Sequence, residues 1–133
     1  MKFKLLLATA VASVSLTACE DLFEDGSLQP DGSTPYLVIH TPTKMQALSK
    51  ASGLRLKYSV SDKDMVKEIQ VQVRESEAGT DYIQYTTQPQ KKWHDVDTLL
   101  STGHLRQGTY TLRIQATDFR TNVASEEVTF TVK

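Results

Sequence analysis

The sequence has one cysteine, one tryptophan and three histidines among its 133 residues. A single cysteine cannot form an intramolecular disulfide, which excludes the small scaffolds in which bridges replace a hydrophobic core. The histidines, His40, His94 and His104, lack the spacing of metal ligands, and the chain has no His-Glu-x-x-His motif. It also has neither a Gly-x-Ser-x-Gly motif nor a phosphate-binding glycine loop. We therefore expect a protein that is not an enzyme and that uses no metal or cofactor.

Long hydrophobic runs are also missing. The longest stretch without a charged residue, residues 5–19, is shorter than the roughly 20 apolar residues that a membrane-spanning helix needs. It follows Lys2 and Lys4, an arrangement typical of a secretory signal peptide. The run ends in Leu16-Thr17-Ala18-Cys19, which resembles the lipobox of bacterial lipoproteins. This resemblance implies removal of residues 1–18 and attachment of lipid to Cys19; the alternative is an ordinary signal peptide with an incidental cysteine.

Residues 19–33 contain acidic residues but no basic ones. The five acids are Glu20, Asp21, Glu24, Asp25 and Asp31, interspersed with Gly, Ser and Pro. Such a segment has too little apolar surface to fold, so we expect a lipidated, flexible tether before a single domain of residues 34–133. The acids after the lipid resemble the export signals of surface lipoproteins in some Gram-negative gut anaerobes. That resemblance implies an exported protein, anchored to the outer membrane and facing the cell surface; acids that only keep the tether soluble are the alternative.

The chain has no excess of charge of one sign. It has 15 basic and 16 acidic residues, and without Lys2 and Lys4 the balance becomes 13 against 16. Subtracting the five acids of the tether leaves 13 against 11, a net charge of +2 for residues 34–133. A nearly neutral domain lacks the basic surface of a nucleic-acid-binding protein, so we expect no nucleic-acid partner.

Alternation of apolar and polar residues dominates the domain and predicts half-buried β-strands. The predicted strands cover residues 36–40, 54–60, 66–73, 81–87, 93–100, 109–116 and 128–132. Prolines on both sides of the first of these segments predict an edge strand. Two alternatives stay open: residues 65–73 also fit a helical period, although strict alternation favours a strand, and residues 43–52 could form one helical turn. Seven short strands predict an antiparallel sandwich of two sheets.

Three segments resemble known β-sandwiches. They read Gly53-x-Leu-x-Leu-x-Tyr-x-Val-x-Asp62, Ile69-x-Val-x-Val73 and Gly108-x-Tyr-x-Leu-x-Ile-x-Ala-x-Asp118-x-x-x-Asn122. They are similar to the immunoglobulin-like, fibronectin III-like and cadherin-like domains of bacterial surface proteins, above all to small single-domain lipoproteins of that type. The resemblance implies an immunoglobulin-like fold with a tyrosine corner at Tyr110. Two departures are evident: Thr121 stands where the usual Asp-x-x-Gly-Asn turn has glycine, and no Cys-Trp-Cys core is present.

Three aromatic residues are candidates for contact with a ligand. Tyr82, Tyr85 and Trp93 fall between Gly79 and Gly103, where the alternation is least regular. Exposed aromatic side chains stack on sugars and peptides. A Trp93 that packs in the core is the favoured alternative, because sandwich tryptophans commonly do so.

Acidic residues at predicted strand ends are a second candidate. Cadherin-like sandwiches sometimes hold calcium through such carboxylates, here Asp62, Asp64 and Asp118. We favour the simpler interpretation that these residues stabilise turns by accepting hydrogen bonds from nearby backbone groups.

Together these features predict a non-catalytic, membrane-anchored β-sandwich lipoprotein that serves as a binding or accessory subunit of a cell-envelope assembly. The alternatives are a glycan-binding surface module that uses exposed aromatic residues and a purely structural envelope protein. The expected partners are the membrane, through the N-terminal lipid, and either another envelope protein or a glycan.

Overall fold

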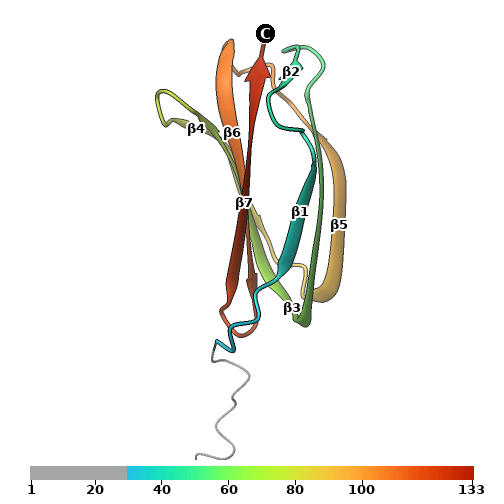
Figure 1. The fold of residues 1–133 in the computed structure, drawn as a ribbon. Helices are drawn as coiled ribbons and strands as arrows, with labels where there is room; N and C mark the ends of the chain where they lie inside the picture. The colour runs from blue at the N-terminus through green and yellow to red at the C-terminus, as the bar shows by residue number, and fades with distance from the viewer. Residues whose placement is uncertain (1–29) are drawn as a thin grey trace, which may run out of the picture.

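The computed structural model describes residues 30–133, so the predicted signal peptide, Cys19 and most of the acidic segment lie outside the described residues. The described chain is all-β, as predicted (Figure 1). Its strands are β1 (Tyr36–Thr41), β2 (Gln46–Leu48), β3 (Leu54–Glu75), β4 (Asp81–Thr87), β5 (Lys91–Leu100), β6 (Gly108–Asp118) and β7 (Val123–Val132). Within residues 30–133 no helix has the length and apolar character needed to cross a membrane.

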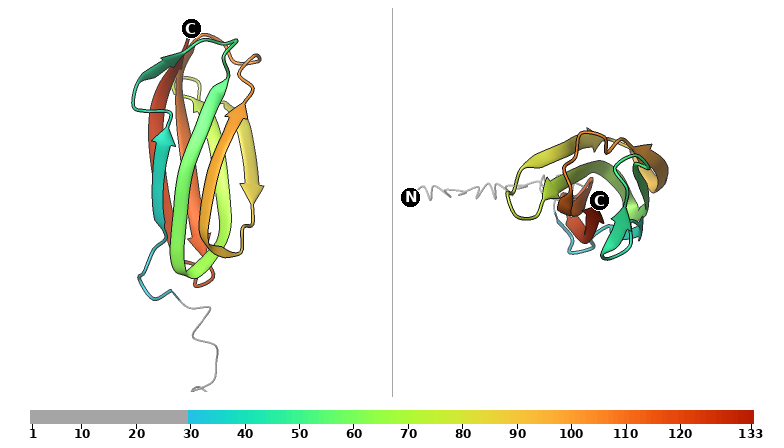
Figure 2. Two further views of the ribbon diagram at one scale, coloured as in Figure 1. Left: turned by 90° about the vertical axis from the view of Figure 1, so that its right-hand side faces the viewer. Right: turned by 90° about the horizontal axis from the view of Figure 1, so that it is seen from above.

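Strand β3 takes part in both layers of the sandwich. Its first part, up to Ser61, pairs antiparallel with β1 on one side and β5 on the other. From Val66 onward it pairs with β6 and β4. Strand β6 pairs with β7, and β2 adds in parallel to the end of β7. The layer β1-β3-β5 therefore faces the layer β4-β3-β6-β7-β2, and the view from above shows the strands surrounding a common interior (Figure 2).

The transition between the layers explains why two predicted strands are one. Met65 adopts a φ of 72°, and the register of β3 against β5 shifts between Ser61 and Val66. This irregularity redirects the strand without ending it, in the way that bulges bend strands. Residues 66–73 are extended throughout, so the strand interpretation is confirmed and the helical alternative is wrong.

The helical turn considered within residues 43–52 is also wrong, because Gln46–Leu48 forms strand β2. The backbone N–H of Lys133 donates to the carbonyl of Leu48 at 2.9 Å, and the Leu48 side chain is buried. Pairing with the edge of β7 outweighs the weak local preference of such a short segment.

The core consists of the apolar residues that the alternation predicted. The side chains of Leu54 and Leu56 in the layer β1-β3-β5 are fully buried, as are Ile69, Leu112, Ile114 and Phe130 of the opposite layer. Tyr110 forms the predicted tyrosine corner: its hydroxyl donates to the backbone carbonyl of Arg106 at 2.9 Å, and its ring stacks on Phe130. The core thus holds the two layers in a fixed relation and leaves their outward sides available.

Candidate functional site

The outward side of the layer β1-β3-β5 carries two strongly exposed aromatic residues. Tyr36 is 69% exposed and Trp93 is 61% exposed. Tyr36 pairs with Ser61 of β3, and Ser61 pairs with Trp93 of β5. The two aromatic side chains therefore belong to one row across three strands, with a short serine side chain between them.

The spacing of this row follows from sheet geometry. Neighbouring strands lie 4.7–4.9 Å apart, so Tyr36 and Trp93 project from backbone positions about 10 Å apart. We use the name aromatic face for the residues of this row and the next, together with His40, which contacts Ser59: Tyr36, Val38, His40, Ser59, Ser61, Trp93 and Asp95. Since Tyr36 is the first residue of β1, the row lies near the end of the sandwich at which residue 30 enters (Figure 1).

A chain of polar contacts crosses the aromatic face. The indole N–H of Trp93 donates to Oδ2 of Asp95 at 2.5 Å. Ser59 and Trp93, in that order, lower the pKa of the Asp95 carboxyl by stabilising its charged form. His40 Nε2 lies 3.0 Å from Oγ of Ser59. Either atom can be the donor in this contact, because the roles of the ring nitrogen and the hydroxyl depend on the tautomer of His40.

This order of groups does not activate a nucleophile. In a serine–histidine–aspartate triad the imidazole lies between the other two groups and accepts the serine proton. Here Ser59, and not the imidazole, lies between His40 and Asp95. The chain of contacts fixes the orientation of the Trp93 indole rather than preparing Ser59 for attack.

The outward side of the layer from Asp95 toward Leu99 has only shallow depressions and equal numbers of positive and negative side chains. A depression of about 300 Å³ adjoins Trp93, Asp95 and Lys57, and a second of about 240 Å³ adjoins Arg55, Asp97 and Leu99. Arg55 binds Asp97 through two hydrogen bonds of 2.9 Å each. Two cations and two carboxylates thus give this part of the sheet no net charge.

The favoured interpretation of Trp93 as a core residue is wrong, and the three predicted aromatic residues do not lie together. Trp93 does not pack in the core, because β5 turns the side of Trp93, Asp95 and Asp97 to solvent. Asp95 and Asp97 could have indicated this orientation from the sequence, because residues two and four positions after Trp93 face the same side of a strand. Tyr82 and Tyr85 lie on β4 in the other layer, where they are half-buried against the core.

Tyr36 was missed by the sequence reasoning. It belongs to a continuously apolar run, which gives no indication of which side faces water. The only available signal was its parity with His40, because both occupy outward positions of β1.

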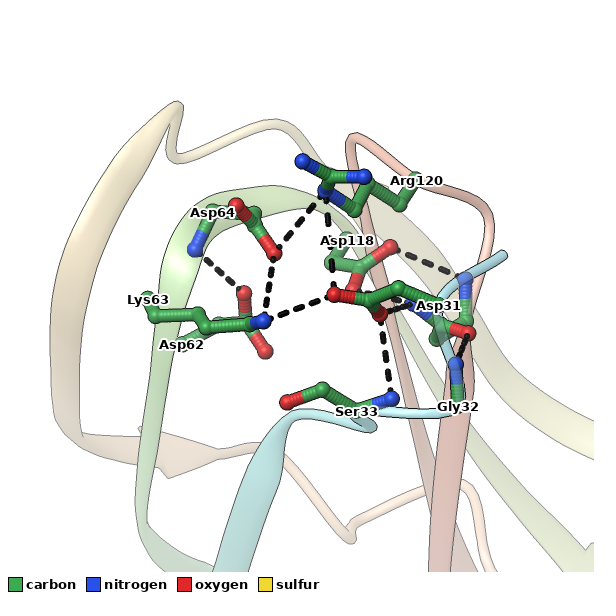
Figure 3. A network of polar contacts seen from close by, with 9 residues as sticks. Asp31, Gly32, Ser33, Asp62, Lys63, Asp64, Asp118 and Arg120 are labelled. Carbon is green, nitrogen blue, oxygen red and sulfur yellow. Dashed lines mark hydrogen bonds and ion pairs between the residues drawn. The ribbon is translucent and has the colours of Figure 1, made fainter. Parts of the chain in front are cut away.

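The acidic residues predicted at strand ends gather at the end of the sandwich where residue 30 enters (Figure 3). Asp62 accepts from the backbone N–H of Asp64 at 2.7 Å, and Asp118 accepts from that of Asn122 at 2.9 Å. Both contacts confirm the predicted turn-stabilising role. We call the group of Asp31, Asp62, Lys63, Asp64, Asp118, Arg120 and Asn122 the base cluster.

The base cluster has its own cations. Carboxylate oxygens of Asp31, Asp64 and Asp118 lie within 4.8 Å of one another. Lys63 Nζ is 2.7 Å from Asp31, and Arg120 Nε is 3.2 Å from Asp64. The hydrogen bond from Lys63, followed by that from the Ser33 backbone, lowers the pKa of Asp31 to about 2. A metal ion at these carboxylates would compete with Lys63 and Arg120, which already pair with Asp31 and Asp64.

The same contacts attach the entering chain to the sandwich. Asn122 Nδ2 donates to Asp31 at 2.8 Å, and the backbone N–H of Gly32 donates to Asn122 Oδ1 at 3.2 Å. The base cluster therefore fixes where the segment before β1 joins the domain, at the end of the sandwich opposite the C-terminus (Figure 1).

The histidines are spread over the molecule. His40 is exposed on β1, whereas His94 is half-buried on β5, where burial lowers its pKa. His104 lies beside the ring of Tyr82, which belongs to β4 of the other layer. Within residues 30–133 the base cluster alone brings together three acidic or histidine side chains that could share an ion.

No family model and no curated protein matches the sequence. Solved structures do match the fold. OgpA from Akkermansia muciniphila has a TM-score of 0.56 at 12% identity, over 79% of this chain and 30% of that one. The fibronectin(III)-like modules of CbhA from Clostridium thermocellum give 0.51 at 14% identity, over 76% of this chain and 47% of that one. The chain thus spans less than half the length of either structure.

At such low identity these matches bear on the fold alone. They show that the described chain, in which a layer of β1, β3 and β5 faces a layer built on β4, β3, β6 and β7, has a fold like that of fibronectin(III)-like modules. The predicted immunoglobulin-like, fibronectin III-like sandwich is confirmed.

Proposed function

We propose that this chain is a non-catalytic binding module of the cell envelope, anchored through lipid on Cys19, that engages its partner with the aromatic face. The observation that carries the proposal is the pair Tyr36 and Trp93, exposed in one row of a sheet. Aromatic residues of this kind dominate binding energy at interfaces. The fold does not need them outside, since the core is complete without them.

The Trp93 side chain is held in one orientation, and this favours a binding role over incidental exposure. An exposed tryptophan normally samples several rotamers, and immobilising it costs binding energy of about 0.5–1.5 kcal/mol. The bond from Trp93 to Asp95 and the contact of Asp95 with Ser59 hold this side chain in the free protein. A partner therefore meets a surface that is already arranged.

Anchoring and surface location belong to the same proposal. Support comes from the lipobox-like Leu16-Thr17-Ala18-Cys19 and from the acids that follow it. With one cysteine in the chain, Cys19 is the only thiol to which lipid could be attached.

The test compares binding to cell envelopes prepared from cells that lack the protein. A form of the protein that begins at residue 30, and therefore carries no lipid, is sedimented with these envelopes as wild type, as Tyr36→Ala/Trp93→Ala and as Arg113→Ala, whose exposed side chain lies on the opposite layer. We expect the wild type and Arg113→Ala to bind equally and the double variant to lose binding. Equal binding of all three proteins would exclude the aromatic face as the binding surface.

A second candidate, an accessory subunit that takes a protein partner, is supported by a different observation. Strand β2 covers only Phe130, Thr131 and Val132 of the outer edge of β7, and β1 pairs with β3 alone. A groove of about 460 Å³ between β1 and β7 is lined by residues that include Leu37, Ile39 and Val128. Open strand edges accept an additional strand from another chain. Cross-linking from Glu126 in intact cells would detect such a partner, and cross-links from the aromatic face alone would exclude it.

A further inference from the structure

We infer that the partner of the aromatic face is a neutral, extended glycan, whose sugar rings stack on Trp93 and Tyr36. This inference rests on the proposed function and names the class of ligand. Aromatic rings present a flat apolar surface, and a pyranose ring offers a matching face of C–H groups. The face holds such rings on two strands separated by one strand, so two stacking platforms are available in a single row.

The separation of the platforms suits a chain of sugars. Two strand spacings of the sheet amount to about 10 Å, which corresponds to alternate rings of an extended oligosaccharide. The intervening ring would lie over Ser61, whose short side chain leaves space between the two aromatic residues. A glycan that crosses the strands thus needs at least three rings to use both platforms.

Groups that can bind sugar hydroxyls lie beside the platforms. Asp95 accepts a hydrogen bond from Trp93, but a carboxylate offers about four lone-pair sites, so it retains capacity for ligand hydroxyls. His40 stands at the far end of the same chain of contacts. A platform edged by fixed polar groups is the arrangement that distinguishes sugar binding from purely apolar contact.

Charge argues against polyanionic partners and membrane headgroups. Arg55 is engaged by Asp97, and Asp95 stands next to Trp93, so an anionic ligand would meet a carboxylate at the site. The base cluster near the row has four carboxylates against the two cations of Lys63 and Arg120. Anionic lipid would be repelled there. A protein hot spot would need an apolar pocket, whereas the residue between the two rings is Ser61.

Trp93 is the only tryptophan in the sequence, so its fluorescence reports on this site alone. The experiment titrates the mature protein in detergent with cellohexaose, xylohexaose, mannohexaose and chitohexaose, and repeats the active titration with the disaccharide. We expect a saturable change of Trp93 emission with at least one hexasaccharide and weaker binding of its disaccharide, which can reach one platform only. Tyr36→Ala should weaken binding about tenfold, in the range of a lost aromatic contact.

Controls separate the possible failures. Leu99→Ala removes an equally exposed apolar side chain from another row of β5 and should leave binding unchanged. All variants should unfold at the wild-type temperature, since neither aromatic ring is in the core.

Envelopes treated with protease should still bind the wild type. If the four sugars give no saturable signal and protease removes envelope binding, the glycan inference is wrong while the proposed function stands. If untreated envelopes do not bind either, both are wrong. Equal affinity for disaccharide and hexasaccharide would exclude two-platform binding.

Discussion

Replacing Thr121 with glycine should stabilise the protein. Thr121 has a φ of 66° in the loop between β6 and β7, and its backbone N–H donates to the carbonyl of Asp118 at 3.2 Å. This is the left-handed position that follows a type I turn in three-residue hairpin loops, where glycine is favoured. A non-glycine residue in this conformation costs about 1–2 kcal/mol, and β-branching places threonine at the upper end.

The gain is smaller than this cost, because glycine also increases the conformational freedom of the unfolded chain by about 0.4–1 kcal/mol. The threonine side chain is exposed, so its removal leaves no cavity. We therefore expect Thr121→Gly to raise the free energy of unfolding by about 0.5–1 kcal/mol, which in a domain of this size corresponds to a rise in Tm of about 2–5 °C.

Thermal unfolding followed by circular dichroism measures the change. The matched control is Val123→Gly, two residues further along, where the backbone is an ordinary β-strand and glycine should destabilise. A Thr121→Gly variant that melts at or below the wild-type temperature would refute the assignment of strain to this position.

Three other changes test separate parts of the structure. Tyr110→Phe removes the bond to the carbonyl of Arg106 and should cost about 1–3 kcal/mol in urea unfolding; Tyr58→Phe is its control, since the buried Tyr58 hydroxyl has no partner among residues 30–133 and its loss should cost nothing. The pKa of Asp31, about 2 in the folded protein against 3.8 as its ordinary value, means that its contribution is full above pH 3.8 and is lost as the pH falls toward 2. Wild-type stability should therefore fall more steeply than that of Asp31→Asn across this interval, and parallel pH profiles would contradict the contact with Lys63. Cys19→Ala should abolish incorporation of a radioactive fatty acid, and a labelled variant would exclude lipidation at that thiol.

Local sequence patterns predicted the parts of the fold that local physics determines. Alternation gave the strands because burial on one side of a sheet imposes a period of two, and β4 has the predicted limits, residues 81–87. Tyr110 was predictable because its corner bond reaches only four residues back along the chain.

Features that depend on distant contacts were not predictable. Strand β2 exists because β7 offers an open edge to pair with. A strand of three residues is too short for the alternation of apolar and polar residues to reveal it. The continuity of β3 depends on Met65 taking a positive φ, which a methionine gives no reason to expect.

The candidate site shows the same limit. Trp93 and Tyr36 are 57 positions apart in sequence and meet only through β3, which lies between their strands. Parity with Asp95 could have placed Trp93 outside, but no local pattern could have paired it with Tyr36. The base cluster similarly joins Asp31 to Asn122 across most of the domain.

The central claim is that the aromatic face is the surface covered by the partner in the envelope. Acrylamide quenching of Trp93 fluorescence, with and without protease-treated envelopes from cells that lack the protein, measures this coverage directly because no other tryptophan contributes. We expect envelopes to reduce the quenching of Trp93 in the wild type and not in Tyr36→Ala at the same concentration. If envelopes leave the quenching of the wild type unchanged while the protein still sediments with them, the aromatic face is not the surface that the partner covers.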